Sequence, residues 1–366
     1  MSESAPMRIA IDGSVLDSRW GGIPKYIVRI AEELAAGGDE IFLLANARRV
    51  HHQIAGAHEV GVRVKGRKLW REAFVPAWAT VRRPDVFWGP EGILPRWVPV
   101  PTVATVHDLA ALRFPGIKPE EHVRQVRTEI GSSVRRADRV ITISAATAED
   151  IEREFGVDRE RMRIIPNGVD AEFAPGDREA ARAAVRERWG IEGSFVLHVG
   201  ALEPRKGLDV LIDAAALAAA EGAGWRVVLA GTPGFGGEEI EARARESGAC
   251  DLIGYVTDEE LLALLRAADA LAAPALYEGF GIPPLEAMAC GTPAVIAADS
   301  GGLVEVSGLA SIVVAERTPE AWRAALEGAL RRPPELIERG LRFADRFRWP
   351  NVAAETRAVF AELAGR

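Results

Sequence analysis

The sequence has 366 residues, of which 48% are hydrophobic and 27% are charged, and its formal net charge is −8. This length is more than twice that of an average domain and predicts two hydrophobic cores, and the composition excludes a disordered chain. An acidic chain lacks the excess of Lys and Arg that nucleic acid requires of its partners, so we expect no nucleic-acid binding.

Two features of the sequence bear on location. Cys250 and Cys290 have neither metal-ligand spacing nor a disulfide framework, which suits a reducing compartment. The N-terminal MSESAPMRIAIDG lacks the regions of a signal peptide, and no apolar run reaches the roughly 20 residues that span a bilayer. We expect a cytoplasmic protein, at most peripheral at the inner face of the cytoplasmic membrane.

Short apolar runs alternate with amphipathic stretches along the chain. This alternation predicts an α/β protein in which βα units form parallel sheets. The strands predicted for the first half are residues 8–12, 40–45, 85–88, 102–107, 139–143 and 163–166. Those predicted for the second half are residues 195–200, 226–231, 251–254, 270–274 and 294–297.

The stretch PNGVDAEFAPGD, residues 166–177, consists largely of turn formers. We place a domain boundary there, which gives an N-terminal domain at residues 1–174 and a C-terminal domain at residues 175–346. A last helix within residues 347–366 follows the helix-breaking RWPN. We expect it to cross back to the first domain.

In doubly wound sheets, ligands bind beyond the carboxyl ends of the strands. The strand FVLHVG is followed by ALEPRKG, which places Arg205 and Lys206 before a helix that begins near Gly207. Two cations beside the free amides of a helix N-terminus can bind a diphosphate. A solvated basic turn is the alternative.

The most informative stretch is ALYEGFGIPPLEAMACGTP. Its two prolines are tolerated only at the start of a helix, so Glu278 falls in a glycine-rich loop and Glu286 in the first turn of the helix. The amides near Gly281 and Ile282 would point outward at the helix start. This predicts a sugar held by backbone donors and one carboxylate, with Glu286 placed for ribose hydroxyls or, alternatively, for the helix dipole.

The first half offers weaker signals. The turn GGIPKY, which includes Gly22, opens an amphipathic helix after the first strand and could bind an anion. His107 and Asp108 end an apolar strand, where a polar pair suggests a cleft, although a structural histidine is the alternative. No Asp-x-Asp pair stands at a strand end to hold a metal against a diphosphate, so we expect metal-independent chemistry.

Residues 63–83 concentrate Lys and Arg with Trp70, Phe74 and Trp78, which recur every four residues. Basic and aromatic residues at helical spacing can rest on an anionic bilayer and bring the enzyme to a lipid-linked acceptor. Alternatively, the three aromatics face the core or line the acceptor site. Either interpretation connects this segment to acceptor choice.

Together these residues resemble glycosyltransferase family 4, whose defining signal is two glutamates separated by seven residues. EGFGIPPLE, from Glu278 to Glu286, fits this signal, and TVHDL, NGVD, VGALEPRKG and GYVTDEEL accompany it. The resemblance covers nearly the whole chain. It implies the GT-B fold, in which two Rossmann-like doubly wound parallel-sheet domains face a central cleft, and a hexosyltransferase that uses a sugar nucleotide.

The resemblance also implies roles for the site residues. Arg205 and Lys206 would bind the donor diphosphate, Glu278 would face the hexose, and His107 would lie near the transferred sugar or the acceptor. Asp108 is an acceptor-side candidate. The other donor-binding residues would be Gly22 at the phosphates, Gly231, Tyr255 and Val256 on the nucleobase side, Phe280, Gly281 and Ile282 through their amides, and Glu286 at the ribose.

The family retains anomeric configuration, by front-face attack in the usual description, and no protein nucleophile is then needed. Many members carry Gly-Arg where this chain has Gly200 and Ala201, which makes Arg205 the main cation. The HDL and LEPRK motifs resemble those of mannosyl- and rhamnosyltransferases of polysaccharide and lipopolysaccharide assembly. It favours GDP-mannose as the donor and a cell-envelope, lipid-linked or polysaccharide acceptor, with UDP-glucose and related donors left open.

Three other functions compete with this one. A nucleotide-sugar epimerase of similar architecture would share the donor site, but the paired glutamates argue against it. A nicotinamide dehydrogenase needs a Gly-x-Gly-x-x-Gly turn after the first strand, which DGSVLDSRWGG does not supply. A catalytically silent sugar-nucleotide-binding protein would be expected to lose the cations or Glu278, and all are present.

Overall fold

The computed structural model describes residues 5–17, 21–47, 54–114, 116 and 118–365. The chain divides into two compact units. The first comprises Met1–Leu112, Glu120–Gly168 and Trp349–Arg366, and the second comprises Arg113–Pro119 and Val169–Arg348. The division after Gly168 falls a few residues before the predicted boundary at residue 175. Each unit contains one parallel sheet.

The first unit holds a seven-stranded parallel sheet in the order β3-β2-β1-β4-β5-β6-β7. Its central β1 pairs with β2 on one side and β4 on the other, so the strand order reverses at β1. Such a reversal marks the edge at which doubly wound sheets bind ligands. The strands are β1 (Arg8–Asp12), β2 (Glu40–Ala45), β3 (Ala57–Gly61), β4 (Val86–Gly89), β5 (Thr102–Val106), β6 (Arg139–Thr142) and β7 (Met162–Ile164).

Alternating side chains of this sheet build a core on each face. Ile9 and Ile11 belong to one cluster with helices α1 and α16, whereas Ala10 belongs to a second cluster on the other face. The helices of the unit are α1 (Gly22–Ala36), α2 (Arg67–Leu69), α3 (Val75–Arg82), α4 (Ala110–Arg113), α5 (Glu120–Gln125), α6 (Gly131–Arg136), α7 (Ala145–Phe155) and α16 (Trp349–Ala364). Short turns of other helical types are η1 (Ser14–Asp17), η2 (Trp70–Phe74), η3 (Val126–Ile130) and η4 (Arg159–Arg161).

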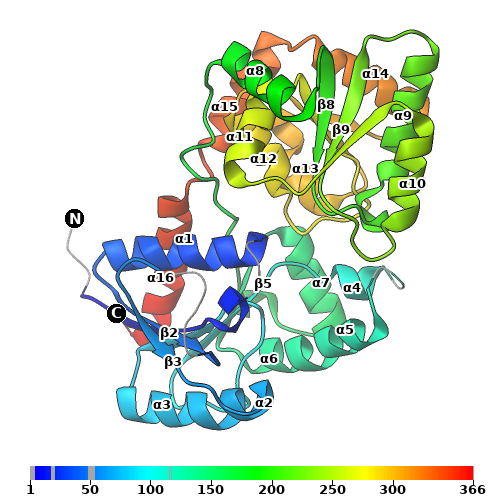
Figure 1. Ribbon diagram of the computed structural model, residues 1–366. Helices are drawn as coiled ribbons and strands as arrows, with labels where there is room; N and C mark the ends of the chain where they lie inside the picture. The colour runs from blue at the N-terminus through cyan, green and yellow to red at the C-terminus, as the bar shows by residue number, and fades with distance from the viewer. Residues whose placement is uncertain (1–4, 18–20, 48–53, 115, 117, 366) are drawn as a thin grey trace. The chain divides into compact units, whose positions relative to one another are not determined.

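The C-terminal helix α16 packs against α1 within the first unit, as Figure 1 shows in red and blue. Trp349 and Phe360 of α16 are buried in the same core as Ile9. A Cβ on Gly168 would lie 2.3 Å from Cδ2 of Trp349, so only glycine lets the chain pass this ring. The return of the last helix to the first unit is what the sequence predicts.

The second unit holds a six-stranded parallel sheet in the order β10-β9-β8-β11-β12-β13. The strand order reverses at β8, which pairs with β9 and β11. The strands are β8 (Ser194–Val199), β9 (Trp225–Ala230), β10 (Cys250–Gly254), β11 (Ala270–Ala273), β12 (Ala294–Ala297) and β13 (Ile312–Val314). Together the two sheets give the pair of doubly wound α/β units that characterises the GT-B fold.

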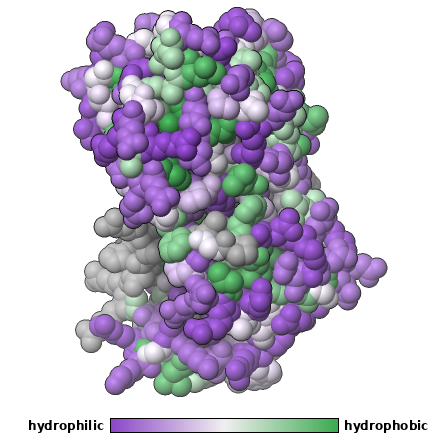
Figure 2. All heavy atoms as spheres, turned by 90° about the vertical axis from the view of Figure 1, so that its right-hand side faces the viewer, coloured by the Kyte–Doolittle hydropathy of each residue, from purple (hydrophilic) through white to green (hydrophobic). Residues whose placement is uncertain are grey.

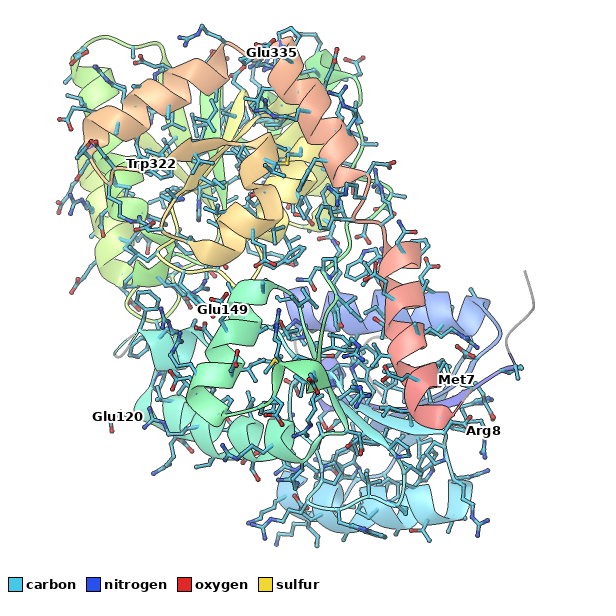
Figure 3. The ribbon with its side chains drawn as sticks, turned by 180° about the vertical axis from the view of Figure 1, so that it is seen from behind. Met7, Arg8, Glu120, Glu149, Trp322 and Glu335 are labelled. Carbon is cyan, nitrogen blue, oxygen red and sulfur yellow. The ribbon has the colours of Figure 1, made fainter. Side chains whose placement is uncertain are left out.

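Helices cover both faces of the second sheet. Trp322 of α14, labelled in Figure 3, is fully buried among β8, β11 and β12 and anchors that helix to the sheet. The helices are α8 (Arg178–Trp189), α9 (Leu208–Ala220), α10 (Glu238–Ser247), α11 (Asp258–Ala267), α12 (Ile282–Ala289), α13 (Gly301–Ser307), α14 (Pro319–Leu330) and α15 (Pro334–Ala344). The 3-10 turns are η5 (Pro204–Lys206) and η6 (Gly308–Ala310).

The predicted strands all form, and two further strands were missed. β3 is an edge strand of sequence AHEVG whose side chains are half-buried or exposed, so it lacks the apolar run of an inner strand. β13 is an edge strand of the second sheet and is only three residues long, which is too short for a recognisable pattern of apolar residues. Each widens its sheet by one outer strand and leaves the central strands, whose carboxyl ends form the ligand-binding edge, unchanged.

The structure corrects the membrane interpretation of residues 63–83 for Trp70. This ring is fully buried in the core cluster of the first unit, and Phe74 and Trp78 pack against the same cluster. Trp78 meets Phe42 of β2 edge to face, with 5.2 Å between ring centroids. Trp70 therefore faces the core, whereas Phe74 and Trp78 pack against it and stay partly exposed.

The surface and the helix lengths also bear on membrane contact. Hydrophilic residues cover most of the face shown in Figure 2. Within the described part of the chain, no helix combines the length and apolar character needed to cross a membrane.

Candidate active site

The turn after β8 carries the two predicted cations. Arg205 and Lys206 lie in η5, and Gly207 then takes a left-handed conformation with φ 62° before α9 begins at Leu208. A Cβ on Gly207 would lie 2.3 Å from the carbonyl oxygen of Pro274, which follows β11. Glycine is therefore required for the two loops to approach this closely, and the approach brings the cations to the next strand's end.

Both cations pair with Glu278. Nη1 of Arg205 lies 3.1 Å from Oε2 of Glu278, and Nζ of Lys206 pairs with Oε1. All three side chains are largely buried, with 13%, 13% and 18% of their surface exposed. Burial alone would raise the pKa of Glu278, but the charges of Lys206 and Arg205 outweigh it and lower that pKa. The glutamate is held ionised between two cations.

Backbone contacts fix this arrangement. The amide of Leu276 donates to the carbonyl oxygen of Arg205 over 2.8 Å, and Nη1 of Arg205 donates to the carbonyl oxygen of Tyr277 over 3.0 Å. The loop after β8 and the loop after β11 are thereby joined on either side of Glu278. A guanidinium can make these contacts together because its donors form a rigid fork.

A second carboxylate, that of Glu203, lies near Nη2 of Arg205, whereas Glu278 lies near Nη1. Oε2 of Glu203 lies 3.5 Å from Nη2 of Arg205, and Oε1 accepts a hydrogen bond of 2.6 Å from Nζ of Lys118. Glu203 is nearly fully buried. Sequence reasoning assigned no role to either residue. Glu203 is part of the LEPRK motif but was not singled out, and Lys118 lies 85 positions from it along the chain.

Helix α12 begins at Ile282, with its two prolines in the first turn as predicted. Gly281 precedes it in a left-handed conformation with φ 97°, and a Cβ there would lie 2.3 Å from Cδ2 of Leu303. Phe280 is buried, and its ring packs against that of Phe347 with 6.1 Å between the centroids. The loop from Glu278 to Ile282 thus presents a carboxylate next to a helix start at which the amide of Ile282 can donate, because Pro283 and Pro284 carry no N–H.

Glu286 requires a correction. Because α12 begins at Ile282, Glu286 lies in its second turn and not in the first, and no acidic residue occupies the first turn. The helix-dipole alternative loses its support, since that effect fades beyond the first turn. Glu286 is 5% exposed.

The predicted nucleobase side lies beyond β9 and β10. A Cβ on Gly231 would lie 1.9 Å from the carbonyl oxygen of Gly200, so the ends of β8 and β9 touch through two glycines. Tyr255 follows β10 and is 66% exposed, and Val256 beside it is half-buried. An exposed tyrosine next to this glycine contact is free to lie against a planar base.

In the first unit, His107 and Asp108 follow β5. Nε2 of His107 lies 2.9 Å from the carbonyl oxygen of Pro90, and its ring meets Tyr26 edge to face at 4.8 Å. Burial lowers the pKa of His107, which keeps the ring neutral. Asp108 is exposed and accepts a hydrogen bond from the amide of Ala110 over 2.9 Å. Gly22 is the exposed first residue of α1.

Two acidic residues that sequence reasoning passed over lie at the same edge of the first sheet. Asp12 ends β1 and is buried, and Oδ1 accepts a hydrogen bond of 3.0 Å from the amide of Ser14. Glu91 follows β4 and pairs with Arg67 at 3.0 Å. Burial raises the pKa of both carboxyls. Asp12 was visible as a polar end to an apolar strand, the same signal that singled out His107.

The described residues contain no group of three or more His, Cys, Asp or Glu side chains that could hold a metal ion. Arg205 and Lys206 are cations that pair with Glu278.

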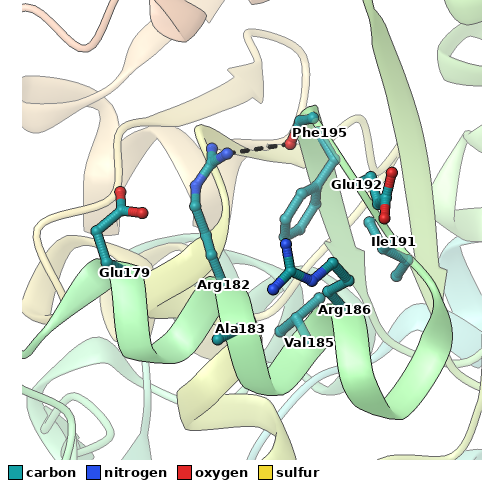
Figure 4. Close-up of a pocket in the computed structure, with 9 residues that line it drawn as sticks. Glu179, Arg182, Ala183, Val185, Arg186, Ile191, Glu192 and Phe195 are labelled. Carbon is teal, nitrogen blue, oxygen red and sulfur yellow. Dashed lines mark hydrogen bonds between the residues drawn. The ribbon is translucent and has the colours of Figure 1, made fainter.

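The second unit also carries an open hollow of about 460 Å³ between α8 and the start of β8 (Figure 4). Arg182 donates to the carbonyl oxygen of Gly193 over 3.1 Å at its rim, and Phe195 lines it. It lies at the amino end of β8, whereas the Arg205 and Glu278 cluster lies beyond the carboxyl ends of β8 and β11. Ligands of doubly wound sheets bind at the carboxyl ends, so volume does not identify the site here.

Comparison with known proteins gives the family. The family described as "Glycosyl transferases group 1" matches residues 182–342, and "Glycosyltransferase Family 4" matches residues 20–173. D-inositol 3-phosphate glycosyltransferase of Nocardia farcinica is 31% identical over 91% of this chain and 83% of that protein. The protein of the same name from Geodermatophilus obscurus is 34% identical over 74% of this chain and 62% of that protein.

Solved structures agree in fold. Sucrose-phosphate synthase from Thermosynechococcus elongatus superposes with a TM-score of 0.76 at 21% identity, over 97% of this chain and 98% of that one. Anabaena HepE in complex with UDP and glucose gives 0.77 at 20% identity, over 98% and 100%. With the two doubly wound sheets and the sequence matches on both units, the chain belongs to glycosyltransferase family 4 and is a GT-B glycosyltransferase.

Proposed function

We propose that this glycosyltransferase moves a hexose, with retention of configuration and without a metal ion, from a sugar nucleotide to a hydroxyl group of its acceptor. One observation carries the proposal: Arg205 and Lys206 converge on the carboxylate of Glu278 beyond the carboxyl ends of β8 and β11. Two buried cations and one carboxylate at a ligand-binding edge match a diphosphate bonded to a sugar.

The cations supply the charge that a departing nucleotide needs. A sugar nucleotide breaks at the bond between the anomeric carbon and the β-phosphate, and negative charge grows on the phosphate as the bond lengthens. Cations fixed in a largely buried site stabilise this charge without reorganising. Arg205 is held by Glu203 and by the Tyr277 carbonyl, so it is positioned before the donor arrives.

The rest of the donor would lie along the same edge. Glu278 and the amides at Phe280, Gly281 and Ile282 would bind the hexose hydroxyls and the β-phosphate, and Glu286 the ribose. The base would lie against Tyr255 and Val256 beside Gly231. This leaves Gly22 of the first unit as the residue proposed to approach the phosphates.

The state of Glu278 supports a mechanism without a protein nucleophile, and retention is what the resemblance to the family implies. A double displacement needs a carboxylate that attacks the anomeric carbon. Both oxygens of Glu278 are paired with cations, and a carboxylate of lowered pKa is a weak nucleophile. We therefore propose front-face attack, in which an oxygen of the leaving phosphate takes the acceptor's proton.

The donor's base and sugar remain predictions. The LEPRK and HDL wording favours GDP-mannose, with UDP-glucose as the alternative. The name of the relatives mentions inositol 3-phosphate and no donor.

For the acceptor, we propose a hydroxyl-rich glycan or lipid-linked sugar of the cell envelope. Asp12, Glu91 and Asp108 end or follow neighbouring strands of the first sheet, and their carboxyl oxygens can accept hydrogen bonds from sugar hydroxyl groups. An inositol phosphate, as in the relatives' name, is the second candidate. His107, beside Asp108, would contact the acceptor or the sugar being transferred.

The test is calorimetry with GDP, UDP and ADP in EDTA, on wild type and Arg205→Ala, with Arg245→Ala as a matched exposed control on α10. One diphosphate should bind without metal, and Arg205→Ala should weaken it by about 1.5 to 3 kcal/mol, the value of a charged hydrogen bond. If no nucleotide binds, or if Arg205→Ala binds as tightly as wild type, the assignment of this site is wrong and a catalytically silent protein on the same fold is favoured. Nucleotide binding with no transfer to any acceptor would favour the epimerase.

A further inference from the structure

His198 is a buried histidine inside β8, the strand that leads to the two cations. It is 3% exposed, and its Nδ1 lies 3.0 Å from the carbonyl oxygen of Ala272 in β11. A carbonyl oxygen can only accept a hydrogen bond, so Nδ1 carries the proton. In the neutral ring, Nε2 is then an acceptor with a lone pair.

This Nε2 atom has no hydrogen-bond partner among the residues that the structure describes. A Cβ built on Gly200 would lie 3.7 Å from Nε2 of His198 and 3.5 Å from Nζ of Lys206. Both nitrogens therefore approach the same point above Gly200, without a direct hydrogen bond between them. A buried acceptor faces a buried ammonium across a short gap.

His198 and Lys206 also line one small cavity of about 20 Å³. His198, Lys206 and Glu278 are its charged or titratable lining residues, and the others are apolar side chains, glycine and proline. A cavity of this size holds about one water molecule, and two or more polar partners are what a buried water requires.

We propose that His198 positions Lys206 through a single bound water, which accepts a hydrogen bond from Nζ of Lys206 and donates one to Nε2 of His198. This inference rests on the proposed function, because it assigns Lys206 to the donor diphosphate. His198 is a positioning residue, since it acts on the donor only through Lys206.

The need for such a contact arises when the donor binds. Glu278 must then turn part of its hydrogen-bonding capacity to the hexose, and Lys206 must exchange this carboxylate, its ionic partner in the described structure, for the diphosphate. A lysine side chain is flexible, so a further fixed contact would keep its ammonium directed at the phosphate during this exchange. The histidine contact stays in place because strand β8 and the bond to Ala272 fix the ring.

The ring also stays an acceptor across the ordinary assay range. Burial lowers the pKa of His198 to about 4, with the charge of Lys206 acting in the same direction and that of Glu278 against it. Lys206 and Glu278 are the charged groups that face the ring from the loops after β8 and β11. A protonated ring would repel Lys206, and the low pKa prevents this.

The test separates the two nitrogens of the ring. His198→Asn places an amide near the position of Nδ1 and can keep the bond to Ala272, whereas His198→Gln can place an amide oxygen near Nε2. Nucleoside diphosphate and monophosphate binding are measured by calorimetry in EDTA for both variants, for Lys206→Ala and for wild type. The monophosphate lacks the β-phosphate, so its binding reports a folded site.

We expect His198→Asn to weaken diphosphate binding about tenfold, the lower end for a charged hydrogen bond, with monophosphate binding unchanged. His198→Gln should bind as wild type does. Equal binding by Asn and wild type, or equal losses in Asn and Gln, would overturn the inference while the proposed function stands. If wild type binds no diphosphate, or Lys206→Ala has no effect, the proposed function falls and the inference with it.

A second measurement needs no variant. Nitrogen NMR of the wild-type protein at pH 7 should show His198 neutral with its proton on Nδ1. A protonated ring, or a proton on Nε2, overturns the inference whether or not the variants fold.

Discussion

Arg205 and Glu278 form an ion pair with 3.1 Å between Nη1 and Oε2, and Lys206 holds the other carboxylate oxygen. The carboxylate thus occupies the cations that a diphosphate would use. Donor binding must divide these charges anew, with the cations on the phosphate and the glutamate on the sugar. The ion pair therefore holds the cations in position for the diphosphate, and its carboxylate also competes with the diphosphate for them.

This competition predicts opposite effects of Glu278→Gln on binding and on turnover. Removal of the negative charge should tighten nucleoside diphosphate binding severalfold, because the cations no longer have an internal partner. Turnover should fall by about two orders of magnitude, since the contact to the transferring sugar is weakened. Calorimetry and a transfer assay measure the two effects.

Glu241→Gln is the matched control, because Glu241 lies on α10 and pairs with Arg245 away from the cations. It should change neither quantity. Weaker diphosphate binding in Glu278→Gln would show that the glutamate helps to hold the phosphate and does not compete with it.

A second prediction concerns pH and stability. The folded pKa of His198 is about 4, below its ordinary value of 6.5. Between these values the unfolded chain takes up a proton that the folded protein refuses, so the free energy of unfolding decreases as pH falls from 6.5 towards 4. At pH 4.5 the loss from this one group is about 2 kcal/mol relative to pH 7.

Urea unfolding at pH 7 and pH 4.5 compares wild type with His198→Gln. His107 and the carboxyl groups titrate in both proteins, so the difference isolates His198. Wild type should lose about 2 kcal/mol more than the variant. Equal losses would mean that the buried ring is not held neutral.

A third prediction addresses the loop before α12. Gly281→Ala must adopt φ near 97° and place its Cβ 2.3 Å from the buried Leu303, so we expect a loss of about 3 kcal/mol and of sugar-nucleotide binding. Gly248→Ala is the control: its φ is 63°, and nothing lies within 4 Å. It should cost about 1 kcal/mol with binding intact. Equal behaviour of the two variants would contradict the close packing at Gly281.

A fourth prediction separates core from membrane in residues 63–83. Trp70→Ala should destabilise the protein by about 3 to 5 kcal/mol in thermal or urea unfolding, because it removes a fully buried ring. Leu69→Ala, at a side chain 56% exposed, should change stability little. Sedimentation with anionic vesicles should be the same for wild type and Trp70→Ala while both are folded. A selective loss of vesicle binding in Trp70→Ala would restore the membrane interpretation.

Much of the fold was predictable from the sequence because buried parallel strands are continuous apolar runs. The strands Arg8–Asp12 and Glu40–Ala45 were predicted to the residue. The edge strand β3 escaped because AHEVG has polar residues on both faces. The periodicity of residues 63–83 predicted a helix but not what its aromatic face contacts, because a stripe of aromatic residues can pack against a core as well as against a bilayer.

The site was predictable where chemistry is local in sequence. Arg205, Lys206 and Glu278 follow strands whose ends meet at one edge, and the structure brings them into contact. The residues that hold them were not. Lys118 reaches Glu203 across 85 positions, and the partners of His198 depend on the pairing of β8 with β11, which strand patterns alone do not specify.

The most direct test of the central claim is nucleoside diphosphate release from GDP-mannose and UDP-glucose, in EDTA, with hydroxyl-rich acceptors, by wild type and Lys206→Ala. We predict release from one donor without metal by wild type, and a rate about two orders of magnitude lower for Lys206→Ala. No release from any sugar nucleotide, or equal rates for the two proteins, would contradict the assignment of this site to glycosyl transfer.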